Sequence, residues 1–262
     1  PFLVDRKGSR AEGVVVSADE RVAARLDFYE LGFGYGVDMR AVHTAVGTER
    51  VRVYLPEMNH WSPAEDWSLE TWQKQHGTLT RAAAADYMQL KETHTPYDAA
   101  RAFPQIRMRA ASKLRALAEP SPSGPFPDMT GMPVRQARTE RPYTDYFAIR
   151  EDWLDFPRFN GGYGETVKRA SFMGGDAVTI LPYDPVTDSV LMVRQFRHGP
   201  YVRGDTNPWT LEPPAGRVDP GEAPEASAKR ELFEETGIEA QDLFFVGRYY
   251  PSPGAVSEHL YS

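Results

Sequence analysis

One stretch of the chain constrains its fold more than any other: residues 216–238, GRVDPGEAPEASAKRELFEETGI. Pro224 suits the first turn of a helix and Gly237 suits the residue just past a helix end, so a helix is predicted between them. We expect three of its apolar residues to face a hydrophobic core: Ala226, Leu232 and Phe233. The stretch therefore predicts a loop beginning at Gly216 and then one capped helix.

Three carboxylates lie on one face of this predicted helix. Glu231, Glu234 and Glu235 stand at positions i, i+3 and i+4, so they project from neighbouring positions. Like charges at this spacing destabilise a bare helix, and a hard divalent cation with oxygen ligands removes the repulsion. A solvated acidic face is the alternative interpretation, and the complete pattern around the glutamates disfavours it.

The order of residues in this stretch resembles the Nudix box, the signature of hydrolases that cleave nucleoside diphosphates linked to another group. The match reads Gly216, five residues, Glu222, seven residues, Arg230-Glu231-Leu232, one residue, Glu234-Glu235, one residue and Gly237-Ile238. Every constrained position of the signature is filled.

This resemblance implies a magnesium site, with manganese as an alternative ion, at the catalytic centre. Its implied oxygen ligands are the Ala215 carbonyl and the carboxylates of Glu231, Glu234 and Glu235. The remaining box positions are implied to be structural: Gly216, Glu222, Arg230 and Gly237. Among these, Arg230 is expected to pair with Glu222 and so hold the loop against the helix.

Length and composition limit the remaining possibilities. At 262 residues the chain exceeds one typical domain, so we expect two. A net charge of −7 argues against a general nucleic-acid-binding surface, although not against nucleotide substrates. The absence of cysteine excludes disulfides and thiolate metal sites. No run approaches the ~20 apolar residues of a membrane span, and no signal peptide is present, so we expect a cytoplasmic protein.

Residues 1–118 are predicted to form a first α+β domain. Its expected elements are a strand over 11–16, a helix after the capping-box spacing of 17–20, strands over 37–42 and 51–55, and helices over 68–91 and 97–117. Residues 32–36 should end the first helix, and Pro104 should bend or break the last. The basic residues of the last helix are expected to form a solvated face: Arg101, Arg107, Arg109, Lys113 and Arg115.

The segment RLDFYELGFGY, followed by VYLPE, resembles the gamma-glutamylcyclotransferase-like family. This resemblance implies that Glu30 acts as an acid/base on a gamma-glutamyl amine. The Tyr-Gly-Ser/Thr-Leu loop with which that family binds substrate does not occur in the sequence. A plain helix-end carboxylate is therefore the alternative interpretation of Glu30.

Residues 119–142 carry six prolines and little apolar periodicity, which predicts a linker between domains. A second domain is predicted over 143–262. Its expected strands are 147–149, 167–172, 177–182, 190–196 and 244–250, with a turn at Asp184-Pro185. The fold class is therefore α/β (α+β): a Nudix α/β/α sandwich with a mixed sheet, preceded by a gamma-glutamylcyclotransferase-like α+β domain.

The residues flanking the box resemble the ADP-ribose pyrophosphatase branch, on the strength of three segments: DAVTILPYDPVTDSVLMVRQFRHGPY, PWTLEPPAGRVDPGE and YYPSPGAVSE. Pro253 occupies a position associated with that branch, although GDP-mannose hydrolases share the Ser-Pro-Gly and the following glutamate. Together with the front domain, the pattern resembles a bacterial group linked to tellurite resistance. The substrate-binding residues that the resemblance implies are Tyr146 on the base, Arg197 on the diphosphate or ribose, Arg169 across a homodimer, and Glu258.

The sequence thus favours magnesium-dependent hydrolysis of ADP-ribose to AMP and ribose 5-phosphate, ahead of GDP-mannose or another nucleotide sugar. Two other classes stay open: a gamma-glutamylcyclotransferase-type enzyme using Glu30, and a non-catalytic ADP-ribose sensor, which the intact glutamates disfavour. The resemblance also implies a general base on a loop beyond Ser262. We expect both domains to be incomplete in this chain.

Overall fold

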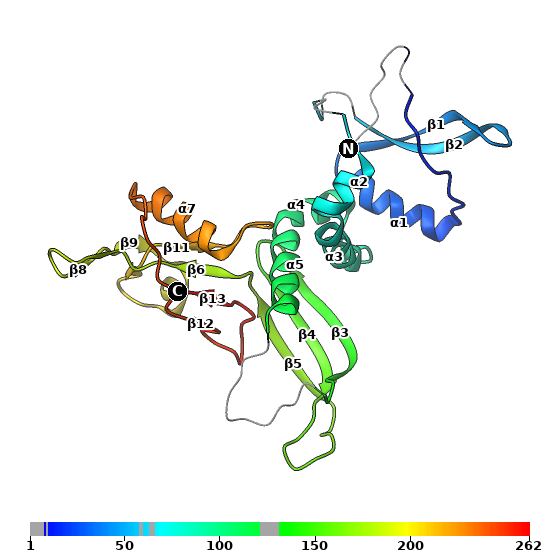
Figure 1. The fold of residues 1–262 in the computed structure, drawn as a ribbon. Coiled ribbons are helices and arrows are strands. Elements are labelled where there is room, and N and C mark those ends of the chain that lie inside the picture. The colour runs from blue at the N-terminus through cyan, green and yellow to red at the C-terminus, as the bar shows by residue number, and fades with distance from the viewer. Residues whose placement is uncertain (1–7, 9, 58–59, 63–65, 121–130) are drawn as a thin grey trace. The chain divides into compact units, whose positions relative to one another are not determined.

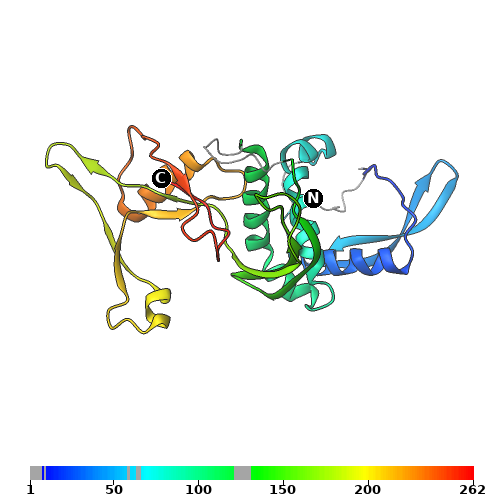
Figure 2. The ribbon, with the colours of Figure 1, turned by 90° about the horizontal axis from the view of Figure 1, so that it is seen from below.

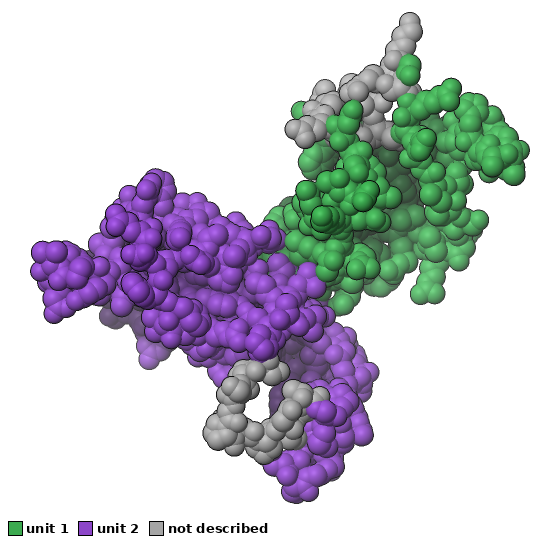
Figure 3. All heavy atoms as spheres, in the orientation of Figure 1, with its two compact units in different colours: residues 1–110 green, residues 111–262 purple. Residues whose placement is uncertain are grey.

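The structure is a computed structural model that describes residues 8, 10–57, 60–62, 66–120 and 131–262. It contains two compact units, residues 1–110 and 111–262 (Figure 3). The first domain is predicted to reach residue 118, whereas the first unit ends at 110. The difference arises because the C-terminal half of helix α5 (Phe103–Ala118) bonds to the second unit through Ser112 and Arg115.

The first unit begins with a helix and an antiparallel hairpin, which are α1 (Glu20–Leu31), β1 (Tyr35–Thr44) and β2 (Gly47–Pro56) (Figure 1). The predictions of this helix and these strands are confirmed. The Asp19 carboxylate caps the helix by accepting a hydrogen bond from the Val22 amide at 2.8 Å, so Asp19 takes the capping place. The chain leaves the helix through Gly34, whose φ of +75° suits glycine.

The rest of the first unit is helical, and its main helices are α2 (Leu69–Trp72), α3 (Thr78–Tyr87), α4 (Pro96–Arg101) and the first half of α5. The single helix predicted over 68–91 is wrong in detail, because a π-helical turn over Gln73–Gly77 and a 3-10 turn over Met88–Leu90 interrupt it. Gly77 is a weak helix former at the end of the π turn. The predicted break near Pro104 is confirmed, because α4 and α5 are separate and Pro104 lies in the first turn of α5.

The core of the first unit is built around Tyr87, which is fully buried. Its ring lies 5.2 Å from Phe28 and 5.6 Å from Phe33, and its hydroxyl donates to the carbonyls of Phe28 and Pro96 at 3.2 and 3.1 Å. Burial raises the pKa of the Tyr87 phenol to about 12. The buried hydroxyl of Tyr87 therefore finds backbone acceptors in two helices, α1 and α4.

The strand predicted over 11–16 is wrong, because those residues form no regular element and are exposed. A strand needs a partner for its backbone groups, and among the described residues β1 and β2 pair only with each other. Val14 is accordingly 88% exposed.

The second unit contains a three-stranded antiparallel sheet and a four-stranded mixed sheet. The first consists of β3 (Arg135–Thr144), β4 (Ala148–Asp155) and β5 (Val167–Met173). The second has the order β11 (Ala215–Arg217), β6 (Ala177–Thr179), β13 (Leu260–Tyr261) and β12 (Arg248–Tyr249), in which only β13 and β6 are parallel. The predicted mixed sheet is therefore confirmed.

Two short hairpins complete the unit, and Figure 2 shows them extending away from the mixed sheet. They are β7 (Tyr183–Asp184) with β8 (Ser189–Val190), and β9 (Val193–Phe196) with β10 (Trp209–Glu212), the latter enclosing α6 (His198–Arg203). The predicted turn at Asp184-Pro185 is confirmed. The Asp184 carboxylate accepts from the Val186 amide and the Thr187 hydroxyl, at 2.8 and 2.7 Å, and these bonds lower the pKa of that carboxyl.

The box helix α7 (Pro224–Thr236) packs on the mixed sheet, and this prediction is confirmed (Figure 1). The buried contacts join Leu232 of the helix to Val178, Ile180 and Val218. The predicted core positions Ala226 and Phe233 are wrong, because both are exposed and Phe233 is 53% exposed. The helix contacts the sheet through Leu232, as predicted, and through Ala228.

Three further expectations also change. Residues 121–130 of the predicted linker lie outside the described residues, but its last part forms β3, because this stretch pairs with β4. The basic residues of α5 are not simply a solvated face, since Arg109 is buried and Arg115 pairs with Asp176 at 2.6 Å. The predicted strand over 244–250 is reduced to β12.

Within the part of the chain that the structure describes, no helix has the length and apolar character needed to cross a membrane.

Candidate active site

The box helix is held at both ends as the sequence predicts. Pro224 takes its first position, where its missing N–H would lack a partner in any case. Gly237 ends the helix in the left-handed conformation, with φ of +72°, and donates its N–H to a carbonyl of the last turn at 2.8 Å. Between these ends, packing of Leu232 on the sheet fixes the rotation of the helix and with it the direction of the glutamates.

Glu231 lies against the backbone of Gly216 in β11. Only 15% of its side chain is exposed, and a Cβ at Gly216 would fall 1.9 Å from its carboxyl carbon. Gly216 itself is fixed by antiparallel pairing with Val178 of β6. The glycine that the box requires therefore makes room for a carboxylate, and no unusual backbone angle is involved.

Replacing Gly216 with alanine is expected to displace Glu231 and to lower the free energy of unfolding by about 1–3 kcal/mol, the usual cost of overpacking. Urea denaturation measures this loss. Gly247→Ala is the matched control, because nothing lies within 4 Å of a Cβ at that position. Equal unfolding midpoints for the two variants would contradict the contact between Glu231 and Gly216.

Glu235 lies beside the first residue of β11, whereas Glu234 lies beside Arg230. An oxygen of Glu235 accepts a hydrogen bond from the Ala215 amide at 3.2 Å. Glu234 is largely exposed and lies 3.3 Å from an Arg230 nitrogen. The structure thus places Glu231 beside Gly216 and Glu235 beside Ala215, whereas Glu234 lies on the solvent side next to Arg230.

The Arg230 guanidinium joins the loop to the helix. Its Nε and Nη2 donate to the Glu222 carboxylate at 3.2 and 2.9 Å, and Nη2 also donates to the Arg217 carbonyl at 3.1 Å. The Ser227 hydroxyl donates to the same carboxylate at 2.5 Å. The predicted pair between Arg230 and Glu222 is present. Its hydrogen bonds hold the pKa of Glu222 below the ordinary value and raise that of Arg230.

The lowered pKa of Glu222 predicts a specific loss of stability in acid. A carboxyl whose folded-state pKa lies below its unfolded value of about 4.3 stabilises the fold above that pH, and the stability is lost as the pH falls through the folded pKa. We expect Glu222→Gln to be less stable than the wild type at neutral pH, with the difference shrinking below about pH 4.

Urea denaturation at a series of pH values measures this difference. Glu225→Gln is the control, because Glu225 lies on the same helix and contacts only Lys229 among the ion pairs described. A stability difference for Glu222→Gln that persists unchanged into acid would contradict the role of this pair.

The donors at this site suit a hard cation. Among the residues that the structure describes, no three Asp, Glu, His or Cys side chains stand close enough together to hold a metal as they are placed. Nη1 of Arg230 instead contacts Glu231 at 2.7 Å and Glu234 at 3.3 Å, so a positive group already lies between two predicted ligands. All of the predicted donors are oxygens, the type that magnesium prefers, and Gly216 leaves the space beside Glu231 free of a side chain.

Arg197, the predicted contact to diphosphate, forms a bidentate ion pair with Glu212 of β10. Its Nε and Nη2 lie 2.9 and 2.7 Å from the two carboxylate oxygens. Hydrogen bonds from Arg197 lower the pKa of Glu212, and the pKa of Arg197 is raised by the same bonds and by the negative charge of Glu235. The negative charge of Glu235 therefore acts electrostatically on the Arg197–Glu212 pair.

Glu212 is a residue that sequence reasoning missed. It lies in the LEPPAG segment just before Gly216, at the end of β10. The available signal was a charged residue close to the box, with a strand before it and two prolines after it. Which arginine it would pair with depends on the hairpin of β9 and β10, and spacing alone does not show that.

Tyr146, predicted to stack on a base, lies in the turn between β3 and β4 and is about half exposed. Its ring is 4.7 Å from that of Phe147, and the Arg217 guanidinium lies 4.7 Å above it. The tyrosine therefore belongs to a cation–π cluster beside the box loop.

The remaining predicted substrate residues lie elsewhere in the second unit. Arg169 is an exposed residue of β5, paired in register with Asp152 of β4, and its guanidinium donates to the Lys168 carbonyl at 3.0 Å. Glu258 is partly buried. A Cβ added at Gly174 would lie 3.0 Å from the Cβ of Glu258. Neither residue makes a described contact with the box glutamates.

Glu30 belongs to the first unit. It lies in the last turn of α1, and its side chain is partly buried. Desolvation raises the pKa of its carboxyl, and its charge contributes to the raised pKa values of Tyr35 and Tyr54. Burial is the first cause of the shift in Tyr54, whose pKa rises to about 12.

The comparisons with known proteins concern the second unit. A family model described as the NUDIX domain matches residues 173–262, so this part of the chain is a NUDIX domain. The resemblance of the box to that family is confirmed. The matched range contains Ala215, Gly216 and the three glutamates.

Two groups of curated relatives are similar to this chain. The ADP-ribose pyrophosphatase of Escherichia coli (strain K12) is 40% identical over 116 residues, which cover 44% of this chain and 55% of the relative. The GDP-mannose pyrophosphatase of Enterobacter sp. (strain 638) is 35% identical over 119 residues, which cover 45% of this chain and 60% of the relative. The chain thus spans little more than half the length of these relatives.

A solved structure of an ADP compounds hydrolase also matches, with 26% identity and a TM-score of 0.39, over 49% of this chain and 64% of that one.

Proposed function

We propose that the chain is a pyrophosphohydrolase that cleaves a nucleoside diphosphate sugar, with ADP-ribose ahead of GDP-mannose. The observation that carries this proposal is the placement of Glu231 beside Gly216 and of Glu235 beside Ala215 within a NUDIX domain. The order of substrates is supported by the higher identity to the ADP-ribose pyrophosphatases. The substrate contains a bond between two phosphates, and its cleavage consumes one water.

The box residues supply the chemistry in this proposal. Magnesium, when held by the three glutamates and the Ala215 carbonyl, neutralises the diphosphate and lowers the pKa of a bound water. Water adds to one phosphorus, the bridging P–O bond breaks, and AMP and ribose 5-phosphate leave, while the two hydrogens of the water end on the product phosphates or leave as protons. Arg230 acts in a positioning role, because it holds Glu222 and the Arg217 carbonyl and so fixes the loop beside the helix.

Other residues would bind the substrate. Arg197 would contact the diphosphate, and Tyr146 would stack on the base. Arg169 and Glu258 would complete the site, Arg169 from the second subunit of a homodimer. A cytoplasmic location belongs to the same proposal.

Removal of the Arg197 guanidinium is expected to raise the KM for ADP-ribose about tenfold or more, because a charge-assisted hydrogen bond to phosphate is lost. Steady-state kinetics of Arg197→Gln measure this change. Arg203→Gln is the control, because Arg203 is a highly exposed arginine of α6 paired only with Asp205 among its described ion pairs. An unchanged KM in Arg197→Gln would remove Arg197 from the substrate site.

Product analysis tests the function itself. Purified full-length chain with magnesium is incubated with ADP-ribose and separately with GDP-mannose, and the nucleotides are separated by chromatography. The proposal predicts AMP from the first and a slower release of GMP from the second. GMP released faster than AMP would reverse the order of substrates.

A second candidate function is favoured by the environment of Glu30. A carboxyl with a raised pKa is suited to general acid/base chemistry, and desolvation raises the pKa of Glu30. We therefore also propose a gamma-glutamylcyclotransferase-type reaction for the first unit. Formation of 5-oxoproline from a gamma-glutamyl peptide, lost in Glu30→Gln, supports it, and no 5-oxoproline from the wild type refutes it.

A further inference from the structure

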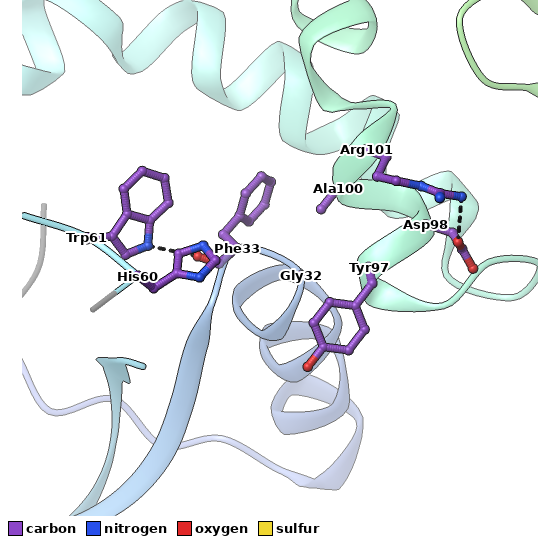
Figure 4. A pocket seen from close by; sticks show the side chains of 8 residues that line it. All are labelled: Gly32, Phe33, His60, Trp61, Tyr97, Asp98, Ala100 and Arg101. Atoms are coloured by element: carbon purple, nitrogen blue, oxygen red, sulfur yellow. Dashed lines mark hydrogen bonds and ion pairs between the residues drawn. The ribbon is translucent and has the colours of Figure 1, made fainter. Parts of the chain in front are cut away.

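A pocket in the first unit is lined by residues to which neither proposed reaction assigns a role. It is an open hollow of about 400 Å³ on the surface, and its lining includes four aromatic or heteroaromatic rings, from Phe33, His60, Trp61 and Tyr97 (Figure 4). The volume lies in the range of small-molecule sites. In Figure 4 the rings of Phe33, His60 and Trp61 lie on one side of the cavity, and Tyr97 lies on the other with Ala100.

Two glycines set the spacing of these walls. A Cβ at Gly32 would fall 2.5 Å from the Pro96 carbonyl oxygen, so only glycine lets the first turn of α4 approach the end of α1 this closely. A Cβ at Gly34 would fall 2.4 Å from the His60 ring, and Gly34 has a φ of +75°. Both walls are therefore determined by backbone contacts that larger residues would prevent.

The aromatic wall is preorganised. The Trp61 indole N–H donates to the Phe33 carbonyl at 2.9 Å, and the Trp61 ring lies 5.2 Å from that of His60. Phe33 in turn packs on Phe103 at 4.8 Å within the core. Trp61 and Tyr97 are nevertheless exposed, so apolar ring surface faces the cavity and would be buried by a ligand.

The rim of the pocket carries an ion pair between Asp98 and Arg101. The two groups differ in how many of their hydrogen-bonding positions are already used. The Asp98 carboxylate already accepts from the Thr95 hydroxyl at 2.6 Å and from Arg101 at 2.9 Å. Arg101 gives that bond from one nitrogen, and 79% of its side chain is exposed. Since a guanidinium carries five N–H donors, the rim offers donors suited to a carboxylate or a phosphate.

We propose that this pocket binds a planar aromatic ring that bears an anionic group. The ring stacks between the wall of His60 and Trp61 and the Tyr97 ring, and the anionic group pairs with Arg101. A ring bearing an amine is a poorer match, because the carboxylate at the rim is already engaged by Thr95 and Arg101. A carboxylate and a phosphate share this chemistry, and the choice between them is made by experiment.

Calorimetry of the full chain with three probes tests the proposal. Indole-3-acetate is the aromatic carboxylate, AMP is the aromatic phosphate, and tryptamine is the cationic counterpart of the first. We expect at least one of the two anions to bind about tenfold or more tightly than tryptamine, and Arg101→Gln to lose that difference. Arg101 is exposed, so the variant is expected to fold, and circular dichroism checks that it does.

Two further variants locate the binding. Tyr97→Ala should weaken binding of the preferred anion, whereas Arg81→Gln, at an exposed position of α3, should leave it unchanged. AMP binding that persists in Arg101→Gln and disappears in Glu231→Gln belongs to the second unit and counts against a phosphate in this pocket. Equal binding of tryptamine, no binding of either anion at millimolar concentration, or full binding by Arg101→Gln would overturn the proposal.

Discussion

Replacing Glu231 with glutamine is expected to reduce magnesium-dependent hydrolysis of ADP-ribose about a thousandfold. Glutamine keeps the shape that fits against Gly216 but removes the negative charge, so the cation loses a ligand at the place where the diphosphate must be neutralised. Stabilisation of charge by a bound metal amounts to several kcal/mol, and each ~1.4 kcal/mol corresponds to a factor of ten in rate. Measurement of kcat over a range of magnesium concentrations gives the effect, and Glu235→Gln should behave in the same way.

The matched control is Glu225→Gln. Glu225 lies on the same helix, is 71% exposed, and forms an ion pair with Lys229 at 3.2 Å. An exposed pair of this kind contributes little, so the variant should keep the wild-type kcat. Wild-type turnover in Glu231→Gln would contradict the assignment of the box glutamates as metal ligands.

Replacing Arg115 with methionine is expected to destabilise the second unit by about 3–5 kcal/mol, because a buried carboxylate would lose its cation. The Asp176 side chain is only 4% exposed, and it accepts from Arg115 at 2.6 Å and from the Ser112 hydroxyl at 2.5 Å. The Asp176 carbonyl also accepts from the Val218 amide at 3.0 Å. This network therefore attaches α5 to the strands that carry Gly216.

Urea denaturation of Arg115→Met measures the loss, with Lys113→Met as the control on an exposed position of the same helix. The double variant Arg115→Met with Asp176→Asn should recover most of the stability, because the uncompensated charge is then absent. A single variant as stable as Lys113→Met would show that the ion pair does not hold α5 to the second unit.

The box could be predicted in detail because its signals are local. Pro224 and Gly237 mark the helix ends through backbone geometry alone, and the spacing of the glutamates fixes their common face. The pair of Arg230 and Glu222 follows from the same short segment, only eight residues apart. Each of these features depends on residues within a few helical turns.

Features that depend on distant partners could not be predicted. Arg115 and Asp176 are 61 residues apart, and nothing in the basic helix indicates which of its charges meets a buried carboxylate. Phe233 was expected in the core, but the sheet contacts Leu232 and Ala228, so the phenylalanine is exposed. Residues 11–16 have the composition of a strand and no partner strand.

The site shows the same division. The glutamates and Gly216 were found by spacing, whereas the bidentate pair of Arg197 with Glu212 depends on how one hairpin places two strands. The residues proposed to select the base or sugar lie outside the box and were identified by resemblance alone. The sequence is therefore more informative about the reaction than about the substrate.

The proposed reaction is tested most directly by the yield of AMP from ADP-ribose with the purified chain, with and without magnesium, beside Glu231→Gln. Equal amounts of AMP and ribose 5-phosphate are expected from the wild type with magnesium, and almost none without the metal or from the variant. AMP release that is the same in the wild type and in Glu231→Gln, or no cleavage of any nucleoside diphosphate sugar by the wild type, would contradict the proposed reaction.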